Sequence, residues 1–333
     1  MRKIRFGIVG AGAIAQAYAM AFQTCDEAEV IAVADVRKEA AAALAEPFRC
    51  ACFSSHQELA ERSKPEAVLI CTPPASHPEI CLRFIEGKVP VLCEKPFAVN
   101  VAETSRVLEA ARKRGVTITM ASKFRYVPDV VEANRIVDAG VLGDIVLFEN
   151  AFAARVDMSH RWNSEPAVSG GGVLIDNGTH SLDLARYFLG PLAEVLAIEG
   201  ARRPGLGVED TVSVFVRSEK GVIGTIDLSW TINKEADRYI GIFGTHGAVL
   251  VGWKQSRYRQ TQSADWTTFG TGYDKIGAFR AQLTNFARAI KGEEVPLVGP
   301  EDILGSVKVI EAAYESLRKS HWTPVNTARL TSA

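Results

Sequence analysis

Asp176 and His180 are the residues in this sequence best suited to moving a proton. They stand four positions apart, shortly after the triple glycine at 170–172. On a helix this spacing places both side chains on one face, and Asp183 continues the same stripe. A histidine beside a carboxylate suits general acid–base catalysis near neutral pH. A solvated polar face explains the pattern equally well, whereas a metal site is disfavoured because no further ligand follows at suitable spacing.

Lys95 is the second candidate for chemistry. It lies between Glu94 and Pro96, directly after the apolar segment 89–93. If that segment is a buried parallel strand, Lys95 follows its carboxyl end, which is where open α/β sheets bind ligands. An ammonium group there can stabilise an alkoxide or polarise a carbonyl. We therefore predict that Lys95 contacts the substrate rather than bulk solvent.

A glycine-rich turn near the N-terminus predicts a dinucleotide site. The segment 10–15 reads Gly-Ala-Gly-Ala-Ile-Ala, which fits the pattern G-x-G-x-x-A between an expected strand and an expected helix. Gly10 permits the tight turn, and Gly12 lets the backbone approach a pyrophosphate at the helix N-terminus. Asp35 ends the next expected strand and can accept hydrogen bonds from ribose hydroxyls.

Asp35 also favours NAD over NADP, because its charge would repel a 2′-phosphate. Arg37 and Lys38 follow closely and leave NADP open, since they can neutralise that phosphate. A proline-stiffened loop, Thr72-Pro73-Pro74 with His77 beyond it, is expected at another strand end on the same side. The residues predicted to bind the cofactor are Gly10, Gly12, Ala13, Ile14, Asp35, Arg37, Thr72, Pro73, His77 and Glu94.

The hydrophobic pattern predicts the strands and helices that position these groups. Up to about residue 121, short apolar runs without alternation are separated by helical stretches. This predicts a doubly wound parallel sheet covered on both faces. Beyond it, longer strand-like stretches at 144–154, 193–200, 210–217, 221–230 and 237–244 predict an antiparallel sheet, interrupted by a helix near 173–189. Two amphipathic helices close the chain, and we expect a domain boundary near 122–128.

Composition narrows the class of partner. The chain of 333 residues has 38 basic and 39 acidic residues, which disfavours nucleic acid as a partner. Its six cysteines include no C-x-x-C pair, so we expect reduced thiols. The N-terminus resembles a signal peptide, but Gly7, Gly10 and Gly12 interrupt its apolar part, and no run reaches the ~20 residues of a membrane span. We predict a cytoplasmic protein.

Taken in order, these motifs resemble the Gfo/Idh/MocA family of glucose–fructose oxidoreductases and inositol dehydrogenases. The matching residues are Gly10-x-Gly12-x-x-Ala15, Thr72-Pro73-Pro74 with His77, Glu94-Lys95-Pro96, Arg125-Tyr126-x-Pro128, Gly140-Val141-Leu142-Gly143 and Gly172-x-Leu174-x-Asp176-x-Gly178-x-His180. The resemblance covers nearly the whole chain. It implies a Rossmann domain over 1–123 and an α/β domain over 124–333, with a large open sheet that forms a homodimer or homotetramer.

The resemblance also implies roles for the candidate residues. His180 would be the general base, Lys95 would stabilise the oxyanion, and Asp176 would hydrogen-bond the substrate. Arg125 is expected beside the substrate. The activity implied is NAD(P)-linked hydride transfer at a secondary alcohol of a sugar, amino sugar or cyclitol. An NADP-linked keto-sugar reductase and a non-catalytic, cofactor-binding sensor are the alternatives, although the intact Lys/Asp/His set favours an enzyme.

A polar loop gives the only direct sign of substrate class. Arg155, Asp157, His160, Arg161, Trp162 and Asn163 precede the triple glycine. Polar groups beside an aromatic suit a sugar ring, so Arg161 and Trp162 are predicted to bind substrate, although an ordinary surface loop has the same composition. Arg202 and Arg203 could meet a phosphate, but a solvated edge or an interface is the favoured interpretation.

Overall fold

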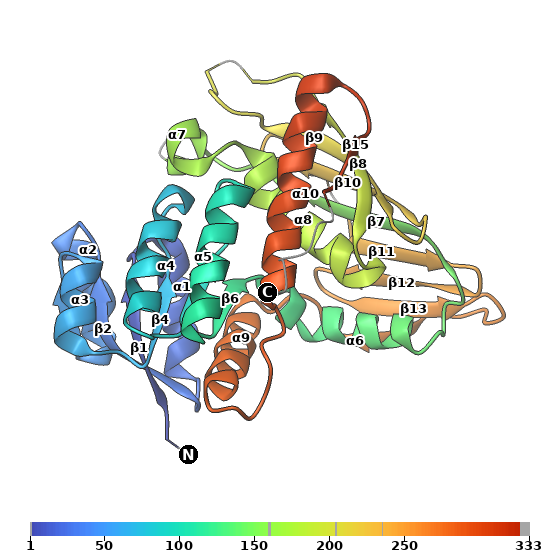
Figure 1. The fold of residues 1–333 in the computed structure, drawn as a ribbon. Helices are drawn as coiled ribbons and strands as arrows, with labels where there is room; N and C mark the ends of the chain where they lie inside the picture. The colour runs from blue at the N-terminus through green and yellow to red at the C-terminus, as the bar shows by residue number, and fades with distance from the viewer. Residues whose placement is uncertain (1, 159–160, 204, 235, 327–333) are drawn as a thin grey trace. The chain divides into compact units, whose positions relative to one another are not determined.

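The computed structural model describes residues 2–158, 161–203, 205–234 and 236–326 (Figure 1). The chain forms two compact units, each made of two separate stretches. The first unit contains residues 1–123 and 275–304, and the second contains 124–274 and 305–333. His160 lies outside the described residues.

The first unit is built on a six-stranded parallel sheet in the order β3-β2-β1-β4-β5-β6. Its strands are β1 (Ile4–Val9), β2 (Ala28–Ala34), β3 (Ala51–Phe53), β4 (Ala67–Ile70), β5 (Val91–Glu94) and β6 (Ile118–Ala121). The helices between them are α1 (Ala13–Gln23), α2 (Lys38–Ala45), α3 (His56–Ser63), α4 (His77–Glu86) and α5 (Val101–Arg114). This is the strand order of dinucleotide-binding folds, so the predicted doubly wound sheet is confirmed.

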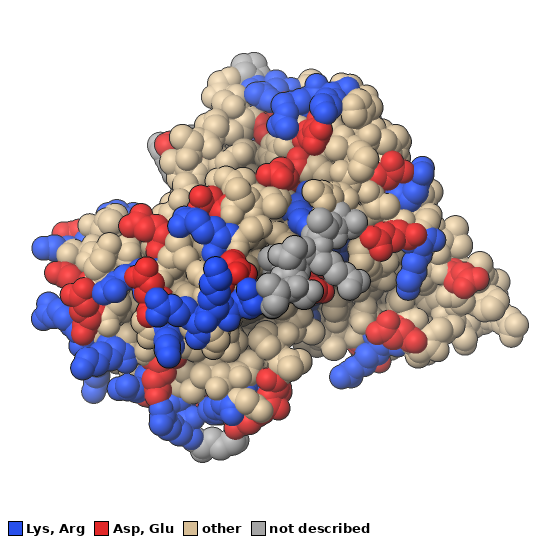
Figure 2. All heavy atoms as spheres, viewed as in Figure 1, with Lys and Arg blue, Asp and Glu red and all other residues tan. Residues whose placement is uncertain are grey.

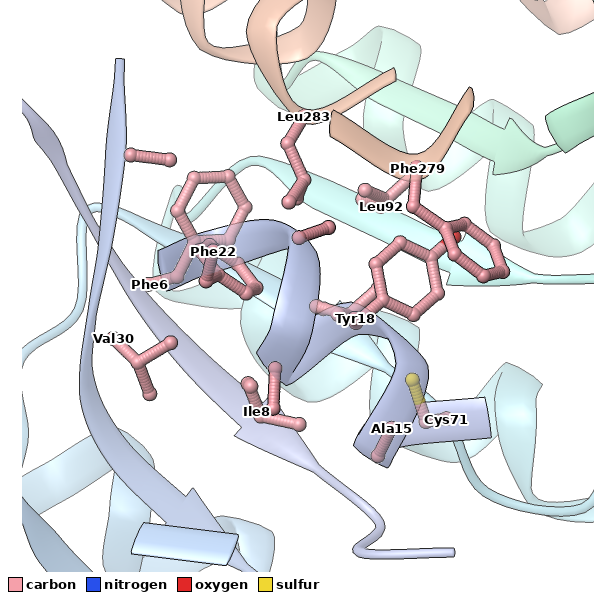
Figure 3. Close-up of a cluster of buried hydrophobic side chains, with 14 of the residues drawn as sticks. Phe6, Ile8, Ala15, Tyr18, Phe22, Val30, Cys71, Leu92, Phe279 and Leu283 are labelled. Atoms are coloured by element: carbon pink, nitrogen blue, oxygen red, sulfur yellow. The ribbon is translucent and has the colours of Figure 1, made fainter. Parts of the chain in front are cut away.

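Helix α9 (Lys275–Ile290) joins the first unit from near the other end of the chain. Figure 3 shows Phe279 and Leu283 of α9 among side chains of α1 and the sheet, in a cluster of buried residues. The Tyr18 ring lies 4.2 Å from that of Phe279, centroid to centroid. The predicted domain division assigned this segment to the second domain. An apolar stripe shows that a helix packs against something, but it does not show which element is the partner.

The second unit is built on a nine-stranded sheet in the order β14-β13-β12-β11-β7-β10-β9-β8-β15. Its strands are β7 (Ile145–Ala153), β8 (Leu192–Glu199), β9 (Thr211–Ser218), β10 (Ile223–Ser229), β11 (Arg238–Gly244), β12 (Gly247–Gly252), β13 (Ser256–Gln260), β14 (Thr267–Gly270) and β15 (Thr323–Pro324). Most neighbours are antiparallel, as expected, but β10 runs parallel to β7. A parallel pair needs a long crossover, and β8, β9 and helix α8 (Val173–Leu189) supply it.

The remaining helices are α6 (Pro128–Asp138), α7 (Pro166–Ser169) and α10 (Pro300–Lys319), with short 3-10 turns at Glu46–Phe48, Pro74–Ser76, Lys123–Tyr126 and Trp162–Ser164. Figure 1 shows α8 and α10 against the same face of the nine-stranded sheet. Strand β9 turns Val212, Val214 and Val216 into the core beneath α8, while Phe215 points outward. Burial of one face therefore sets the strand register.

Charged side chains are interspersed over the face shown in Figure 2. Basic and acidic groups alternate there, in agreement with the formal net charge of -1. Within the described residues, no helix is long and apolar enough to cross a membrane.

Candidate active site

Helix α8 carries Asp176 and His180. Its N-terminus is bound by a carboxylate from a residue far away in the sequence. Glu209 Oε1 accepts hydrogen bonds from the backbone N–H of Gly172 at 2.8 Å and of Leu174 at 3.1 Å. The hydroxyl of Tyr314, on α10, donates to the same oxygen at 2.7 Å. A Cβ at Gly172 would collide with the Glu209 backbone, which explains why glycine stands there.

His180 is 8% exposed and lies edge-on to two aromatic rings. Its ring centroid is 5.0 Å from that of Phe124 and 6.4 Å from that of Phe152. Phe124 and Phe152 stack on each other at 4.7 Å. This wall restricts the imidazole to a narrow range of orientations, which suits a positioned general base. Asp176, one turn earlier on α8, is partly exposed.

Arg125, which was predicted to lie beside the substrate, forms a buried ion pair. Its guanidinium forms a two-pronged ion pair with Asp183, with Nε–Oδ2 at 2.9 Å and a terminal nitrogen on Oδ1 at 2.7 Å. Both side chains are almost fully buried. Asp183 is therefore occupied as a structural partner, and the pair fixes α8 against the 3-10 turn Lys123–Tyr126.

In the first unit, Lys95 follows β5 directly, as predicted. Its backbone N–H donates to Glu94 Oε2 at 3.0 Å, and its peptide bond to Pro96 is cis. Glu94 is 5% exposed. Burial raises the pKa of the Glu94 carboxyl, and the charges of Lys95 and Lys123 oppose that rise. The Lys95 side chain is partly exposed, whereas the carboxyl beside it is enclosed.

His77, which was predicted to bind the cofactor, is completely buried, and its contact with a dinucleotide stays a prediction. Its Nδ1 lies 3.0 Å from the Pro96 carbonyl oxygen and its Nε2 lies 2.8 Å from that of Thr72. The imidazole thus ties the Thr72 loop to the loop that carries Lys95. Burial lowers the pKa of His77, although the carbonyl contacts act in the opposite direction.

The glycine turn has the geometry that a pyrophosphate site requires. Gly10 adopts φ +94°, and a Cβ there would come within 2.7 Å of the Cys71 backbone. Gly12 caps α1 without a side-chain hydrogen bond, and nothing lies within 4 Å of where its Cβ would be. The amides of Ala13 and Ile14 begin the helix. An open helix N-terminus without an acidic first turn fits a bound phosphate group.

Asp35 is placed to meet a ribose and also braces the turn. Its Oδ2 accepts the Ala11 N–H at 2.7 Å, and its Oδ1 accepts the Arg37 N–H at 2.8 Å. The Arg37 side chain is 68% exposed, and its contact with Asp35 is weak, with Nε 3.4 Å from Oδ1. The carboxylate is thus held by backbone donors and keeps further acceptor positions for hydroxyl groups. These residues fit a nicotinamide dinucleotide.

Arg161 and Trp162 lie on the surface of the second unit, at the 3-10 turn Trp162–Ser164. Trp162 is 39% exposed. In the described part of the chain, neither residue forms a hydrogen bond, ion pair or ring contact with Asp176 or His180. Their binding role stays a prediction.

Glu209 and Tyr314 are the positioning residues that sequence reasoning missed. Glu209 stands just before a strand and Tyr314 lies within an amphipathic helix, where each is an ordinary residue. The one available signal was the triple glycine, because consecutive glycines before a helix indicate the close approach of another segment. Among the described residues, no group of three potential ligands could hold a metal ion.

Comparisons with known proteins agree with this geometry. Residues 4–122 match the model of the oxidoreductase family with an NAD-binding Rossmann fold, and residues 130–250 match the GFO/IDH/MocA C-terminal domain. The chain therefore belongs to the Gfo/Idh/MocA family of nicotinamide-dependent oxidoreductases. The family predicted from the sequence motifs is confirmed.

Individual relatives cover most of the chain. The chain is 30% identical to mouse trans-1,2-dihydrobenzene-1,2-diol dehydrogenase over 74% of each protein. It is 24% identical to myo-inositol 2-dehydrogenase of Thermotoga maritima over 95% of this chain and 97% of that protein. Levoglucosan dehydrogenase, solved with NADH and levoglucosan, matches 98% of this chain and all of its own with a TM-score of 0.89 at 21% identity. At that identity, the structural likeness establishes the fold.

Proposed function

We propose that this oxidoreductase transfers a hydride at a secondary alcohol or ketone carbon of a sugar, amino sugar or cyclitol. The observation that carries the proposal is the pair on α8, with Asp176 one turn before a histidine oriented by two aromatic rings. The relatives' names support the substrate class, since they include an inositol dehydrogenase and a diol dehydrogenase.

The proposed mechanism divides the work among the chain's own groups. His180 takes the hydroxyl proton during oxidation and returns it during reduction. Asp176 accepts a hydrogen bond from a neighbouring hydroxyl and so orients the substrate, and the Lys95 ammonium stabilises the developing oxyanion. The bound nicotinamide supplies a C4 position that accepts or donates the hydride.

We assign NAD as the favoured cofactor, with NADP as the alternative. Gly10, Gly12 and the first amides of α1 would hold the pyrophosphate, and Asp35 the ribose hydroxyls. The Asp35 carboxylate supports NAD because it is held by two backbone donors and cannot turn away from a 2′-phosphate. The exposed Arg37 beside it supports the alternative of an NADP-linked keto-sugar reductase.

We also propose that the protein forms homo-oligomers through the outer face of the nine-stranded sheet. Ile198, Phe215 and Ile223 lie on that face on the adjacent strands β8, β9 and β10, and each is more than a third exposed. An apolar sheet face of this kind suits contact with a second copy. Light scattering on the purified protein measures the assembly directly. The cytoplasmic location stays a prediction.

The decisive experiment measures NADH and NADPH formation with cyclitols, sugars, amino sugars, sugar acids and sugar phosphates. Wild-type protein is compared with His180→Ala and with His321→Ala, an exposed histidine that serves as the matched control. Loss of a general base lowers turnover by roughly 10²–10⁴-fold. We expect that loss for His180→Ala alone.

Two results would count against the proposal. If His180→Ala and the control turned over equally, the base would lie elsewhere. If the protein bound cofactor but showed no turnover in either direction, including reduction of keto-sugars, a non-catalytic sensor would be the better description.

A further inference from the structure

A hollow of about 530 Å³ lies in the second unit, beyond the carboxyl ends of the parallel strands β7 and β10. Three segments that are far apart in the sequence form its wall. The lining residues are Arg155, Val156, Asp157, Met158, Arg203, Gly205, Leu206, Trp230 and Thr231. A volume of this size is within the range of small-molecule sites.

Backbone hydrogen bonds fix both arginine-bearing loops. The Arg155 N–H donates to Asn233 Oδ1 at 2.8 Å, and the next residue's N–H donates to the Trp230 carbonyl at 2.8 Å. On the other loop, the Arg203 N–H donates to Asp210 Oδ2 at 3.1 Å. Asp210 is 1% exposed, and its carbonyl accepts the Trp230 N–H. Both arginines are therefore anchored to the end of β10.

Both lining arginines are exposed, and the lining as a whole carries a small formal positive charge. Two arginines and one aspartate give 2 − 1 = +1. No carboxylate of a described residue forms an ion pair with Arg155 or Arg203. Arg202 contrasts with them, because Glu199 holds it in a two-pronged pair at 2.6 and 3.0 Å. Arginine binds carboxylate and phosphate groups through the same two-pronged geometry.

The rest of the wall suits a carbohydrate. Val156 and Leu206 are partly exposed and give the hollow an apolar side against which a sugar ring can pack.

The hollow is connected with the residues on α8. Phe152, near the end of β7, packs its ring against His180. Its carbonyl oxygen accepts a hydrogen bond from Asn177 Nδ2 of α8 at 3.2 Å. The chain then continues from β7 to Arg155, the first lining residue. The same strand end thus borders both the proposed base and the hollow.

We propose that this hollow binds an anionic substituent, a carboxylate or a phosphate, on the sugar or cyclitol substrate. The inference rests on the proposed function for the identity of the rest of the ligand. Arg155 and Arg203 hold the anion, and Val156 and Leu206 contact the ring. The substrate class is therefore a sugar acid or sugar phosphate rather than a neutral sugar.

Calorimetry on the NAD-loaded protein tests the site without depending on turnover. The probes are D-glucuronate, D-glucose 6-phosphate and neutral D-glucose, and the first two distinguish carboxylate from phosphate. We expect at least one anionic probe to bind at least ~10-fold more tightly than glucose, with an affinity that falls as salt is added. Arg155→Ala and Arg203→Ala should each remove most of that preference, and the matched control Arg202→Ala should keep it.

The outcomes separate this inference from the proposed function. Equal binding of all three probes, no binding of any, or a preference unchanged in both arginine variants overturns the anionic site. Turnover assays on the same samples are judged separately. Anion-selective binding without turnover supports the site and counts against the proposed reaction, whereas turnover of neutral sugars without anion selectivity does the reverse.

Discussion

Glu209 joins three parts of the second unit, and its removal is the sharpest test of how α8 is held. Glu209→Ala removes the acceptor for two backbone N–H groups at the start of α8 and for the Tyr314 hydroxyl. Water does not replace the lost carboxylate as a hydrogen-bond acceptor for these donors, because Glu209 is 5% exposed. Burial and the nearby carboxylate raise the pKa of Tyr314, so its hydroxyl stays protonated and donating.

The expected cost follows from these contacts. A hydrogen bond to a charged group contributes about 1.5–3 kcal/mol, and loss of a helix N-cap costs about 0.5–2 kcal/mol. Because the three bonds share one oxygen and are not additive, we expect Glu209→Ala to lower the free energy of unfolding by about 3–4 kcal/mol. Tyr314→Phe removes one bond and should cost about 1–2 kcal/mol.

Urea unfolding followed by tryptophan fluorescence measures this directly. All five tryptophans lie between residues 162 and 322, within the second unit, so the signal reports that unit. In the double variant the two losses should overlap, with a coupling of about 1–2 kcal/mol. Glu199→Ala, which breaks an exposed pair with Arg202, is the control and should change little. Fully additive losses, or a Glu209→Ala variant as stable as the control, would refute the reasoning.

Three further perturbations follow from the site. Arg125→Ala leaves the Asp183 carboxylate buried and unpaired and should cost about 3–5 kcal/mol by the same urea assay, whereas Arg125→Met with Asp183→Leu should recover much of it; equal instability would contradict a buried pair. Asp35→Ser should raise the preference for NADP over NAD in fluorescence titrations, and an unchanged ratio would remove Asp35 from the cofactor site. The pKa of His77 is lower in the folded protein than its unfolded value of about 6.5. The contribution of His77 to the free energy of unfolding is therefore full above a pH of about 6.5. It declines as the pH falls below that value, by at most about 1.4 kcal/mol per pH unit. His77→Gln should flatten that pH dependence, and an identical slope would show that His77 does not titrate on unfolding.

The sequence by itself determined the six-stranded parallel sheet of the first unit and which groups are candidates for the chemistry. The apolar runs of β1 and β4 and the glycine turn at 10–15 are local signals, because each depends on residues a few positions apart. The same is true of Lys95 after β5 and of the Asp176–His180 spacing on α8. Helix periodicity places two such side chains on one face wherever the helix packs.

Those local patterns could not predict which residues, distant in the sequence, would pair or pack with one another. The burial of His77 and of the Arg125–Asp183 pair could not be predicted, because burial depends on what packs around a residue. The parallel pairing of β10 with β7 needs the whole crossover between them.

Only the tertiary structure joined Glu209 and Tyr314 at the start of α8, and Arg155 and Arg203 around one hollow. In each case two segments with unremarkable local patterns meet because other elements bring them together. Local pattern determines which side faces inward, but it does not determine which distant residue lies opposite. The sequence therefore predicts which groups carry the proposed chemistry, and the packing of the chain decides which residues position them.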